Sequence, residues 1–309
     1  MGTAVPISAA ASDYELFRVL KEPTGYVNSL AFSPDGSFLF VASDDGGVTQ
    51  WSAASGEPMR VWNEGRGAVY SVAISPDGRM LAMGGLDETI RLRELSSGRE
   101  LASLKGHDGW INAVAFTPDG RELVSAGRDS SVRIWEVSTG KNLRAMKDYP
   151  SEVFALAVSP DGRLLASDKG DSFSIRDLAT GREVADGAPG QWGITTLGFA
   201  PGSDELLTSG YDGKLWSWAG AGNRVVSKAA IGGGPVISIA IRADGLLLAA
   251  LCSGDKTVKV FDTRSWIETG HLDGISYPTG SVAFSADGRY LAAGGGDSPV
   301  RVWRRRDAR

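Results

Sequence analysis

Apolar and polar residues alternate along this chain in short segments that return with a fixed period. One unit contains apolar segments at residues 111–116, 122–126, 132–135 and 142–146, with polar turns between them. Alternation with a period of two over such short segments predicts β-strands. The pattern therefore predicts an all-β fold made of four-stranded antiparallel units, and we find no segment with a sustained helical period.

A turn tetrapeptide marks each unit. Ser-Pro-Asp-Gly or Thr-Pro-Asp-Gly occurs at 33–36, 75–78, 117–120 and 159–162, and degenerate copies follow at 200–203, 242–245 and 285–288. Proline sets the backbone for the second position of a tight turn, and glycine accepts the left-handed conformation. Seven units of about 42 residues predict a seven-bladed β-propeller, in which each unit must stack on its neighbours to bury its faces.

An aspartate precedes the third strand of most units, and a tryptophan follows it six residues later. The pairs are Asp45 and Trp51, Asp129 and Trp135, Asp212 and Trp218, and Asp297 and Trp303. These residues resemble the WD-repeat family of β-propellers, and the regularity of the turns is typical of its bacterial members. Three units depart from the pattern: Phe261 follows Asp255, Arg93 follows Asp87, and Asp171 lies only five residues before Arg176, which predicts a different loop there.

The resemblance also implies a buried hydrogen-bond relay in the third unit, formed by His107, Ser125, Asp129 and Trp135. Such a relay pairs polar groups that would otherwise be buried without partners, so we assign these four residues a structural role. His271 also follows a glycine but lies farther from its turn, and its place in a relay is left open.

The seventh unit ends at its third strand, at residues 300–303, and the N-terminal segment 13–20 resembles the fourth strand of other units. We expect this segment to form the outer strand of the last blade and to close the ring, which protects open sheet edges. The predicted organisation is a flexible N-terminal tail at 1–12, one propeller at 13–303 and a basic C-terminal tail at 304–309.

Composition narrows the classes of function. A net charge of -5 argues against a nucleic-acid-binding protein, and no apolar segment is long enough to cross a membrane. The start of the chain lacks the features of a secretory signal, and Cys252 is the only cysteine, so we predict a cytoplasmic protein with this thiol in the core. The oligomeric state is left open.

In the WD-repeat family, two positions at the start of the first strand and the one before the loop aspartate face one end of the ring. Carried over to this chain, and with Trp192 added from just outside the pattern, they give the predicted partner-binding residues: Tyr26, Asn28, Asp44, Tyr70, Leu86, Trp110, Asn112, Arg128, Glu152, Phe154, Trp192 and Tyr211. Aromatic and arginine side chains dominate binding interfaces, so this end is predicted to bind a protein or peptide.

The predicted function is a non-catalytic interaction scaffold or assembly subunit, with no catalytic residue, cofactor or metal. The alternative is a propeller hydrolase or lactonase-like enzyme with its site in the central channel. An enzyme of that kind needs several His, Asp or Glu side chains at the channel mouth, whereas the carried-over positions hold only Asp44 and Glu152.

Overall fold

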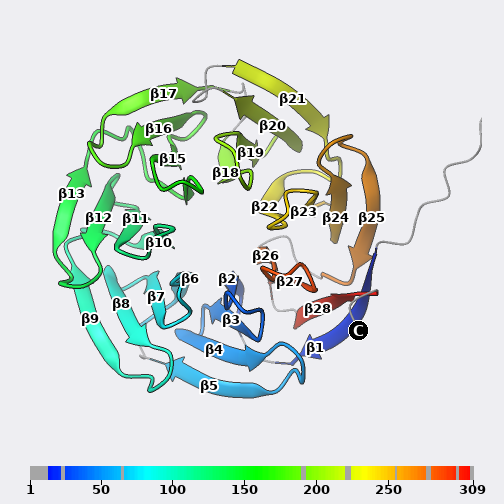
Figure 1. Cartoon of the computed structure of the whole chain (residues 1–309), viewed down its shortest axis with the longest axis horizontal. Helices are drawn as coiled ribbons and strands as arrows, with labels where there is room; N and C mark the ends of the chain where they lie inside the picture. The colour runs from blue at the N-terminus through cyan, green and yellow to red at the C-terminus, as the bar shows by residue number, and fades with distance from the viewer. Residues whose placement is uncertain are drawn as a thin grey trace, which may run out of the picture.

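Seven four-stranded antiparallel sheets surround a central channel in the computed structural model of the chain (Figure 1). The structure describes residues 13–21, 25–63, 66–188, 193–219, 224–254, 256–275, 280–296 and 299–306. Within these ranges the secondary structure consists of strands and turns, without a helix. The predicted seven-bladed propeller is confirmed, whereas the predicted tail at 1–12, Trp192, Asp255 and Asp297 lie outside the described residues.

Blades one to four follow one another along the chain, each with its first strand at the channel and its fourth on the circumference (Figure 1). Their strands are β2 (Val27–Phe32), β3 (Phe38–Ser43), β4 (Gly47–Ser52) and β5 (Pro58–Asn63); β6 (Val69–Ile74), β7 (Met80–Gly85), β8 (Thr89–Glu94) and β9 (Glu100–Lys105); β10 (Ile111–Phe116), β11 (Glu122–Gly127), β12 (Val132–Glu136) and β13 (Asn142–Met146); and β14 (Leu156–Val158), β15 (Leu164–Asp168), β16 (Phe173–Asp177) and β17 (Glu183–Gly187).

Blades five and six repeat this order, and blade seven combines both ends of the described chain. Their strands are β18 (Ile194–Phe199), β19 (Leu206–Gly210), β20 (Lys214–Ala219) and β21 (Arg224–Ala230); β22 (Val236–Ile241), β23 (Leu247–Cys252), β24 (Thr257–Asp262) and β25 (Glu268–Asp273); and β26 (Gly280–Phe284), β27 (Tyr290–Gly295), β28 (Val300–Arg305) and β1 (Tyr14–Leu20).

Strand β1 closes the ring by pairing antiparallel with β28, from Tyr14 opposite Arg305 to Leu20 opposite Val300. Leu20 is buried between blades seven and one, and Tyr14 is buried between blades six and seven, where its hydroxyl donates to the Gly288 carbonyl at 2.6 Å. The N-terminal strand is therefore the outer strand of the last blade, as predicted, and it also contributes to both interfaces of that blade.

The first two residues of the predicted C-terminal tail belong to a strand. Arg304 and Arg305 belong to β28, because they pair with Glu15 and Tyr14 across the sheet, and Arg304 also forms an ion pair with Glu15 at 3.2 Å. The ladder thus continues for two residues beyond the predicted end of the propeller.

The Pro-Asp-Gly turns are fixed by their own side chains. In the first blade the Ser33 hydroxyl donates to Asp35 at 2.5 Å and accepts from the Phe38 amide at 2.9 Å, while Asp35 accepts from the Ser37 amide. The same set of contacts recurs at residues 75–80, 117–122, 159–164 and 285–290. The hydroxyl and the carboxylate together therefore set where each second strand begins.

Apolar packing lies between blades rather than within them. Each of the seven buried clusters takes its residues from two neighbouring blades, as where Leu92 of blade two meets Trp135 of blade three. The last interface, between blades seven and one, contains Val302 and Trp51. Because a sheet exposes two apolar faces, each blade depends on both neighbours to bury them.

Arginines on the circumference join some blades to the next. Arg18 of β1 and Arg60 of β5 donate to the Ser55 and Leu95 carbonyls at 3.1 and 2.8 Å, in the turn between the third and fourth strands of the following blade. Arg144 of β13 bonds the Leu178 carbonyl in the same way at 2.8 Å. These contacts satisfy carbonyl groups of a turn that does not form a ladder.

We expect Leu20→Ala to lower the free energy of unfolding by about 2 to 5 kcal/mol, because it opens a cavity where the ring closes. Leu16→Ala in the same strand is the matched control, since Leu16 is 54% exposed and its loss should change stability by less than about 0.5 kcal/mol. Chemical denaturation of the two variants measures the difference. Equal effects would show that β1 does not close the ring through its buried face.

Candidate functional site

One end of the ring collects the residues predicted to bind a partner. In blade three the Arg128 amide donates to the Trp110 carbonyl at 2.8 Å, so the loop after the second strand lies beside the start of the first. The same contact joins Asp44 to Tyr26, Leu86 to Ala68, and Tyr211 to Gly193. The Pro-Asp-Gly turns lie at the opposite end of the ring, because each first strand begins beside these loops and ends at its turn.

Five of these side chains form what we call the aromatic cluster: Tyr70, Trp110, Arg128, Glu152 and Phe154. The rings of Tyr70 and Trp110 lie 5.7 Å apart, and the Arg128 guanidinium lies 4.0 Å from the Trp110 ring centre and 5.8 Å from that of Phe154. Phe154 is 48% exposed. Three consecutive blades thus contribute to one continuous surface of rings and an arginine.

The charge of Arg128 is only partly balanced. Its guanidinium lies 3.7 Å from the Glu152 carboxylate, and both side chains are about two-fifths exposed. A solvent-exposed ion pair of this kind contributes little to stability. The guanidinium also lies over the Trp110 ring at 4.0 Å from its centre, within the range of a cation–π contact.

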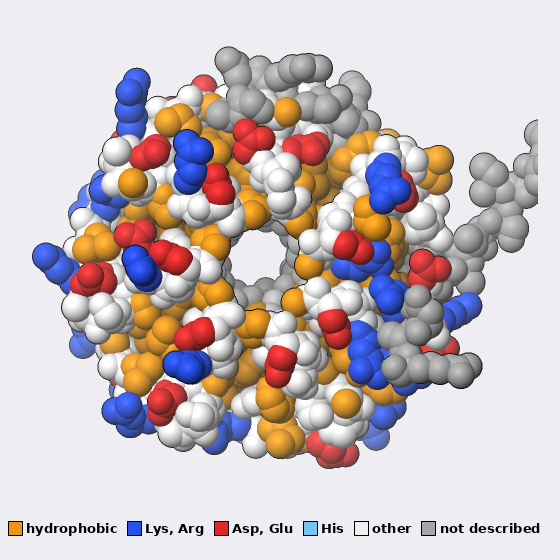
Figure 2. Space-filling model, viewed as in Figure 1, with side chains coloured by type: hydrophobic (Ala, Val, Ile, Leu, Met, Phe, Trp, Pro, Cys, Tyr) orange, Lys and Arg blue, Asp and Glu red, His pale blue; other side chains and the backbone are white. Residues whose placement is uncertain are grey.

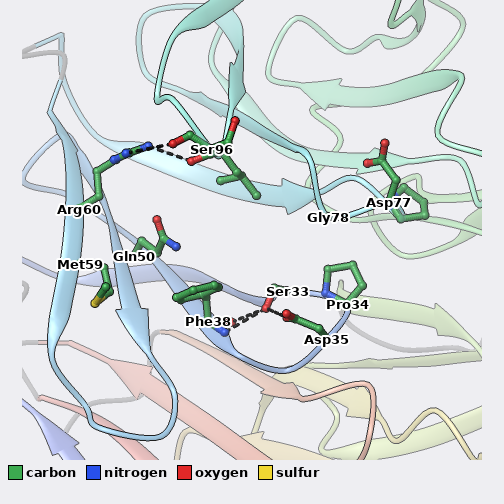
Figure 3. Close-up of a pocket in the computed structure, with 12 residues that line it drawn as sticks. Ser33, Pro34, Asp35, Phe38, Gln50, Met59, Arg60, Asp77, Gly78 and Ser96 are labelled. Carbon is green, nitrogen blue, oxygen red and sulfur yellow. Dashed lines mark hydrogen bonds between the residues drawn. The ribbon is translucent and has the colours of Figure 1, made fainter.

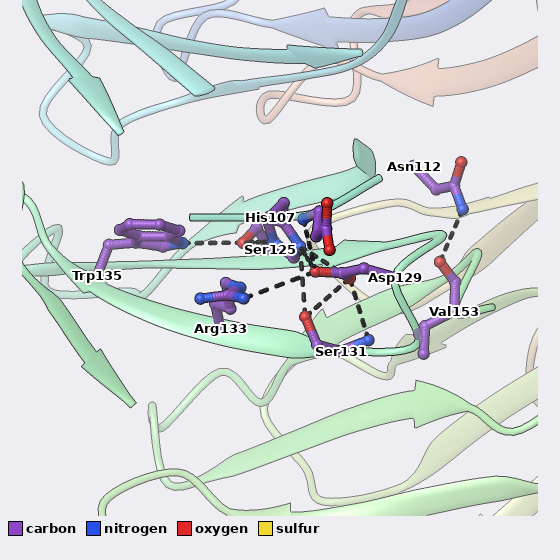
Figure 4. A network of polar contacts seen from close by, with 9 residues as sticks. His107, Asn112, Ser125, Asp129, Ser131, Arg133, Trp135 and Val153 are labelled. Carbon is purple, nitrogen blue, oxygen red and sulfur yellow. Dashed lines mark hydrogen bonds and ion pairs between the residues drawn. The ribbon is translucent and has the colours of Figure 1, made fainter. Parts of the chain in front are cut away.

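Two predicted binding residues are engaged with the neighbouring blade. The Asn28 side-chain amide donates to Asp44 at 2.6 Å and to the Val69 carbonyl at 3.0 Å, and that of Asn112 donates to the Val153 carbonyl at 2.9 Å (Figure 4). These amides therefore join the first strand of one blade to the first strand of the next blade or to the segment just before it, which favours a structural role for both asparagines.

The remaining predicted residues stand apart from the aromatic cluster. Tyr26 and Tyr211 are 48% and 60% exposed, and neither ring contacts another ring among the described residues. Leu86 is half-buried in its loop. The predicted surface thus divides into a cluster on blades two to four and two isolated tyrosines.

The four predicted relay residues lie in hydrogen-bond contact within blade three (Figure 4). Trp135 Nε1 donates to Ser125 Oγ at 2.8 Å, His107 Nε2 lies 2.7 Å from the same oxygen, and His107 Nδ1 lies 3.0 Å from Asp129. Asp129 also accepts from the amides of Asp108 and Ser131. The relay thus ties the loop of Arg128 to the blade core.

Burial and hydrogen bonding act in opposite directions in the relay. Burial lowers the pKa of His107, and the adjacent Asp129 carboxylate offsets only part of that effect. Burial alone would raise the pKa of Asp129, but the Asp108 amide and His107 lower it below its usual range. The two groups therefore favour a neutral imidazole hydrogen-bonded to an ionised carboxylate at neutral pH.

Blade four contains a buried carboxyl that the sequence did not point to. Asp168 is 1% exposed at the end of β15, where blades two, three and five have Gly84, Ala126 and Ser209, and one oxygen accepts from the amides of Phe154 and Ala155 at 2.8 Å each. The other oxygen has no partner among the described residues, and burial raises the pKa of Asp168 to about 6. Asp168 therefore positions the backbone of Phe154 in the aromatic cluster.

The sequence did show that blade four has an unusual loop, because Asp171 lies five residues before Arg176 instead of six. Asp171 accepts from the Gly193 amide of the next blade at 2.8 Å, and at the tryptophan position Arg176 pairs with Asp148 at 2.7 Å. The first strand of this blade, β14, is correspondingly short. A one-residue change in the loop therefore coincides with a different set of polar contacts.

The other titratable groups singled out in the sequence lie elsewhere. His271 is on the circumference in β25, with its Nδ1 3.5 Å from Glu268, and contacts none of the relay residues, whereas Cys252 is buried. Among the described residues, no group of three or more His, Cys, Asp or Glu side chains is arranged to hold a metal ion. None of the described segments is a helix that could cross a membrane.

The channel is open through the centre of the ring, and acidic and basic side chains are spread around it over the visible end (Figure 2). This architecture, with its repeated turns and loop aspartates, defines a closed seven-bladed propeller of the repeat-protein class. A family model described as the IFT122 first β-propeller matches residues 68–309, and one for the WD domain, G-beta repeat, matches residues 14–52. The chain therefore belongs to the WD-repeat propeller family, in the group that the first of these models describes.

Curated relatives match parts of the chain. It is 33% identical over 110 residues, 36% of its length, to a Dictyostelium discoideum protein called U5 small nuclear ribonucleoprotein 40 kDa protein, and 32% identical over 106 residues, 33% of its length, to WD repeat-containing protein 1 of Gallus gallus. A third relative, probable cytosolic iron-sulfur protein assembly protein 1 of Yarrowia lipolytica, is 40% identical over 65 residues, 20% of the chain.

The matched regions span 31%, 17% and 20% of these three relatives, respectively. All three organisms are eukaryotes, so the bacterial character of the repeats stays a prediction.

We expect His107→Ala to lower the free energy of unfolding by about 1 to 3 kcal/mol, because it leaves the buried Asp129 carboxylate without its imidazole partner. His271→Ala is the matched control in a chain with two histidines, and it should change stability by less than about 0.5 kcal/mol. Urea denaturation at neutral pH compares the variants. A loss confined to His271→Ala would contradict the structural role of the relay.

We expect Asp168→Asn to change the pH dependence of stability. Because folding raises the pKa of Asp168 to about 6, its contribution to stability is fully present at acidic pH and is lost as pH rises through that value. Relative to the variant, the wild type should lose about 2 kcal/mol of unfolding free energy between about pH 4.5 and about pH 7.5. Asp186→Asn, at an exposed position in the same blade, should leave the pH profile unchanged.

Proposed function

We propose that this protein is a non-catalytic cytoplasmic scaffold that binds a peptide or protein partner on the aromatic cluster. The observation that carries the proposal is the stack of Arg128 on Trp110, flanked by Tyr70 and Phe154 from the neighbouring blades. Tryptophan, tyrosine and arginine are the residues most enriched among binding hot spots. Here they are adjacent, partly exposed and supplied by a closed ring.

The rigidity of the surface supports this function. The backbone of the aromatic cluster is held by hydrogen bonds, since the Arg128 amide donates to the Trp110 carbonyl and the Phe154 amide donates to the Asp168 carboxyl. A partner would therefore bind side chains that are already ordered, and the entropic cost of binding would be small. The guanidinium can donate hydrogen bonds to a carboxylate or a backbone carbonyl of the partner.

The names of two relatives are consistent with a role in assemblies. One is named as a small nuclear ribonucleoprotein protein and another as an iron-sulfur protein assembly protein. Since each match covers a third or less of the relative, those names support only the general idea of a scaffold. The proposal of a peptide or protein partner rests on the aromatic cluster.

The test is affinity capture with the purified full chain as bait in a lysate of the source cells, comparing wild type with Tyr70→Ala/Trp110→Ala. We expect proteins recovered with the wild type to fall at least tenfold with the double variant, because hot-spot aromatics contribute about 2 kcal/mol or more each. Both baits must melt at the same temperature for the comparison to be valid.

Tyr26→Ala/Tyr211→Ala is the matched control, because it removes two tyrosines from the same end but leaves the aromatic cluster intact. This variant should retain the partner. A partner held equally by all three baits would move the binding surface elsewhere. Recovery of no partner, together with a stoichiometric bound metal ion and hydrolytic activity, would favour a propeller hydrolase or lactonase-like enzyme.

A further inference from the structure

A groove of about 510 Å³ opens between blades one and two at the end of the ring that carries the Pro-Asp-Gly turns (Figure 3). The aromatic cluster lies at the opposite end, so the groove does not belong to the surface described above. Its apolar wall contains Pro34, Phe38 and Met59, and Met59 is 59% exposed. A groove that combines apolar and polar lining residues is a candidate for an interaction surface.

Gln50 is out of place in the repeat. It stands one residue before Trp51 in the third strand, and the corresponding residues of the other six blades are Leu92, Ile134, Ile175, Ser217, Val260 and Val302, each buried to 1% exposure or less. In blade one the side chain is half-buried and lines the groove, with no hydrogen bond to any described residue (Figure 3). Its amide can therefore both donate to and accept from a ligand.

The rim of the groove is acidic. Asp35 and Asp77 stand at its edge, and the Ser33 and Ser75 hydroxyls hold the pKa of the respective carboxyl below its usual range. Both carboxylates are thus ionised at neutral pH. Each uses Oδ1 for the contacts of its turn, and Asp77 Oδ2 also lies 4.0 Å from the exposed Arg79 guanidinium.

Arg60 is the one cation that lines the groove among the described residues. Its guanidinium donates to the Leu95 and Ser96 carbonyls at 2.8 and 3.3 Å, so these N–H groups are directed into the protein (Figure 3). Two carboxylates against one guanidinium leave the lining with a net negative charge. Charge complementarity therefore favours a basic ligand.

We infer that this groove binds an extended peptide segment of a partner protein in which a basic residue stands beside an aliphatic one. The aliphatic side chain packs on Phe38 and Met59, the basic head lies against Asp35 and Asp77, and the Gln50 amide pairs with the peptide backbone. Binding in this way buries apolar area and at the same time provides hydrogen-bond partners for the Gln50 amide.

The groove between blades three and four is an internal comparison. It has equivalent turn carboxylates, Asp119 and Asp161, and Arg144 bonds the next blade as Arg60 does. However, Ile134 takes the place of Gln50, and Glu122 takes the place of Phe38. The turn acids are therefore common to the repeat. The groove between blades two and three also has an apolar wall, with Met80 and Leu101 in place of Phe38 and Met59, so it is the amide of Gln50 that is particular to the first groove.

The test is selection of random decapeptides displayed on phage against the immobilised full chain, in parallel with Gln50→Leu. This variant restores the aliphatic residue found in blade two and is expected to melt at or above the wild-type temperature. Peptides enriched on wild type over the variant should carry Lys or Arg next to Leu, Ile or Val. Enrichment without that pair, or equal enrichment on both proteins, would overturn the proposal.

The strongest selected peptide, labelled with fluorescein, then gives dissociation constants by anisotropy. We expect Asp35→Asn/Asp77→Asn to weaken its binding at least tenfold, and Asp119→Asn/Asp161→Asn, which makes the same changes in equivalent turns, to alter it less than twofold. Equal losses in both double variants would show that the turns act through folding alone and would refute the site. Tyr70→Ala/Trp110→Ala should bind the peptide normally, because this groove is independent of the aromatic cluster.

Discussion

Burial of both faces of each sheet is the constraint on which this structure depends. A single four-stranded blade has two apolar faces and no interior of its own, so every buried cluster is shared between neighbours. The ring is stable only because the last interface is made like the others, with β1 supplying Leu20 to one side of blade seven and Tyr14 to the other. The local turn chemistry keeps each blade in the register that this packing requires.

Packing of this kind explains why the two ends of the ring can differ. The interfaces are fixed by residues in the middle of strands, so the loops at one end and the turns at the other are free to vary from blade to blade. Blades two to four use that freedom to bring together Trp110, Arg128 and Phe154. Blade one differs within its strands instead, where Gln50 of β4 and Met59 of β5 line the same groove.

The fold could be predicted from the sequence because its period, turns and strand alternation are local and repeat seven times. The relay contacts were predictable for the same reason, since His107, Ser125, Asp129 and Trp135 keep fixed intervals within one unit. The contacts that a side chain makes with the next blade could not be predicted in this way. Asn28 and Asn112 occupy partner-facing positions by spacing, yet each bonds a carbonyl whose position depends on the next blade.

Asp168 was missed for a related reason. Its sequence position is that of a strand residue, and only the altered course of β14 brings the Phe154 and Ala155 amides to its carboxylate. Gln50 was visible as an exception once third strands were aligned, but the groove around it depends on the turn of blade two as well. Contacts between units are thus the part of the site that a one-dimensional pattern does not contain.

The pairing of β1 with β28 also has a mechanical consequence. Tyr14 lies opposite Arg305, so the chain enters β1 and leaves β28 at the same end of one antiparallel ladder. A force that pulls these two points apart acts first on the terminal hydrogen bonds and then on each next pair, as in opening a zipper, instead of shearing the whole ladder at once. The blade that completes the circle is therefore also where the ring yields first under tension.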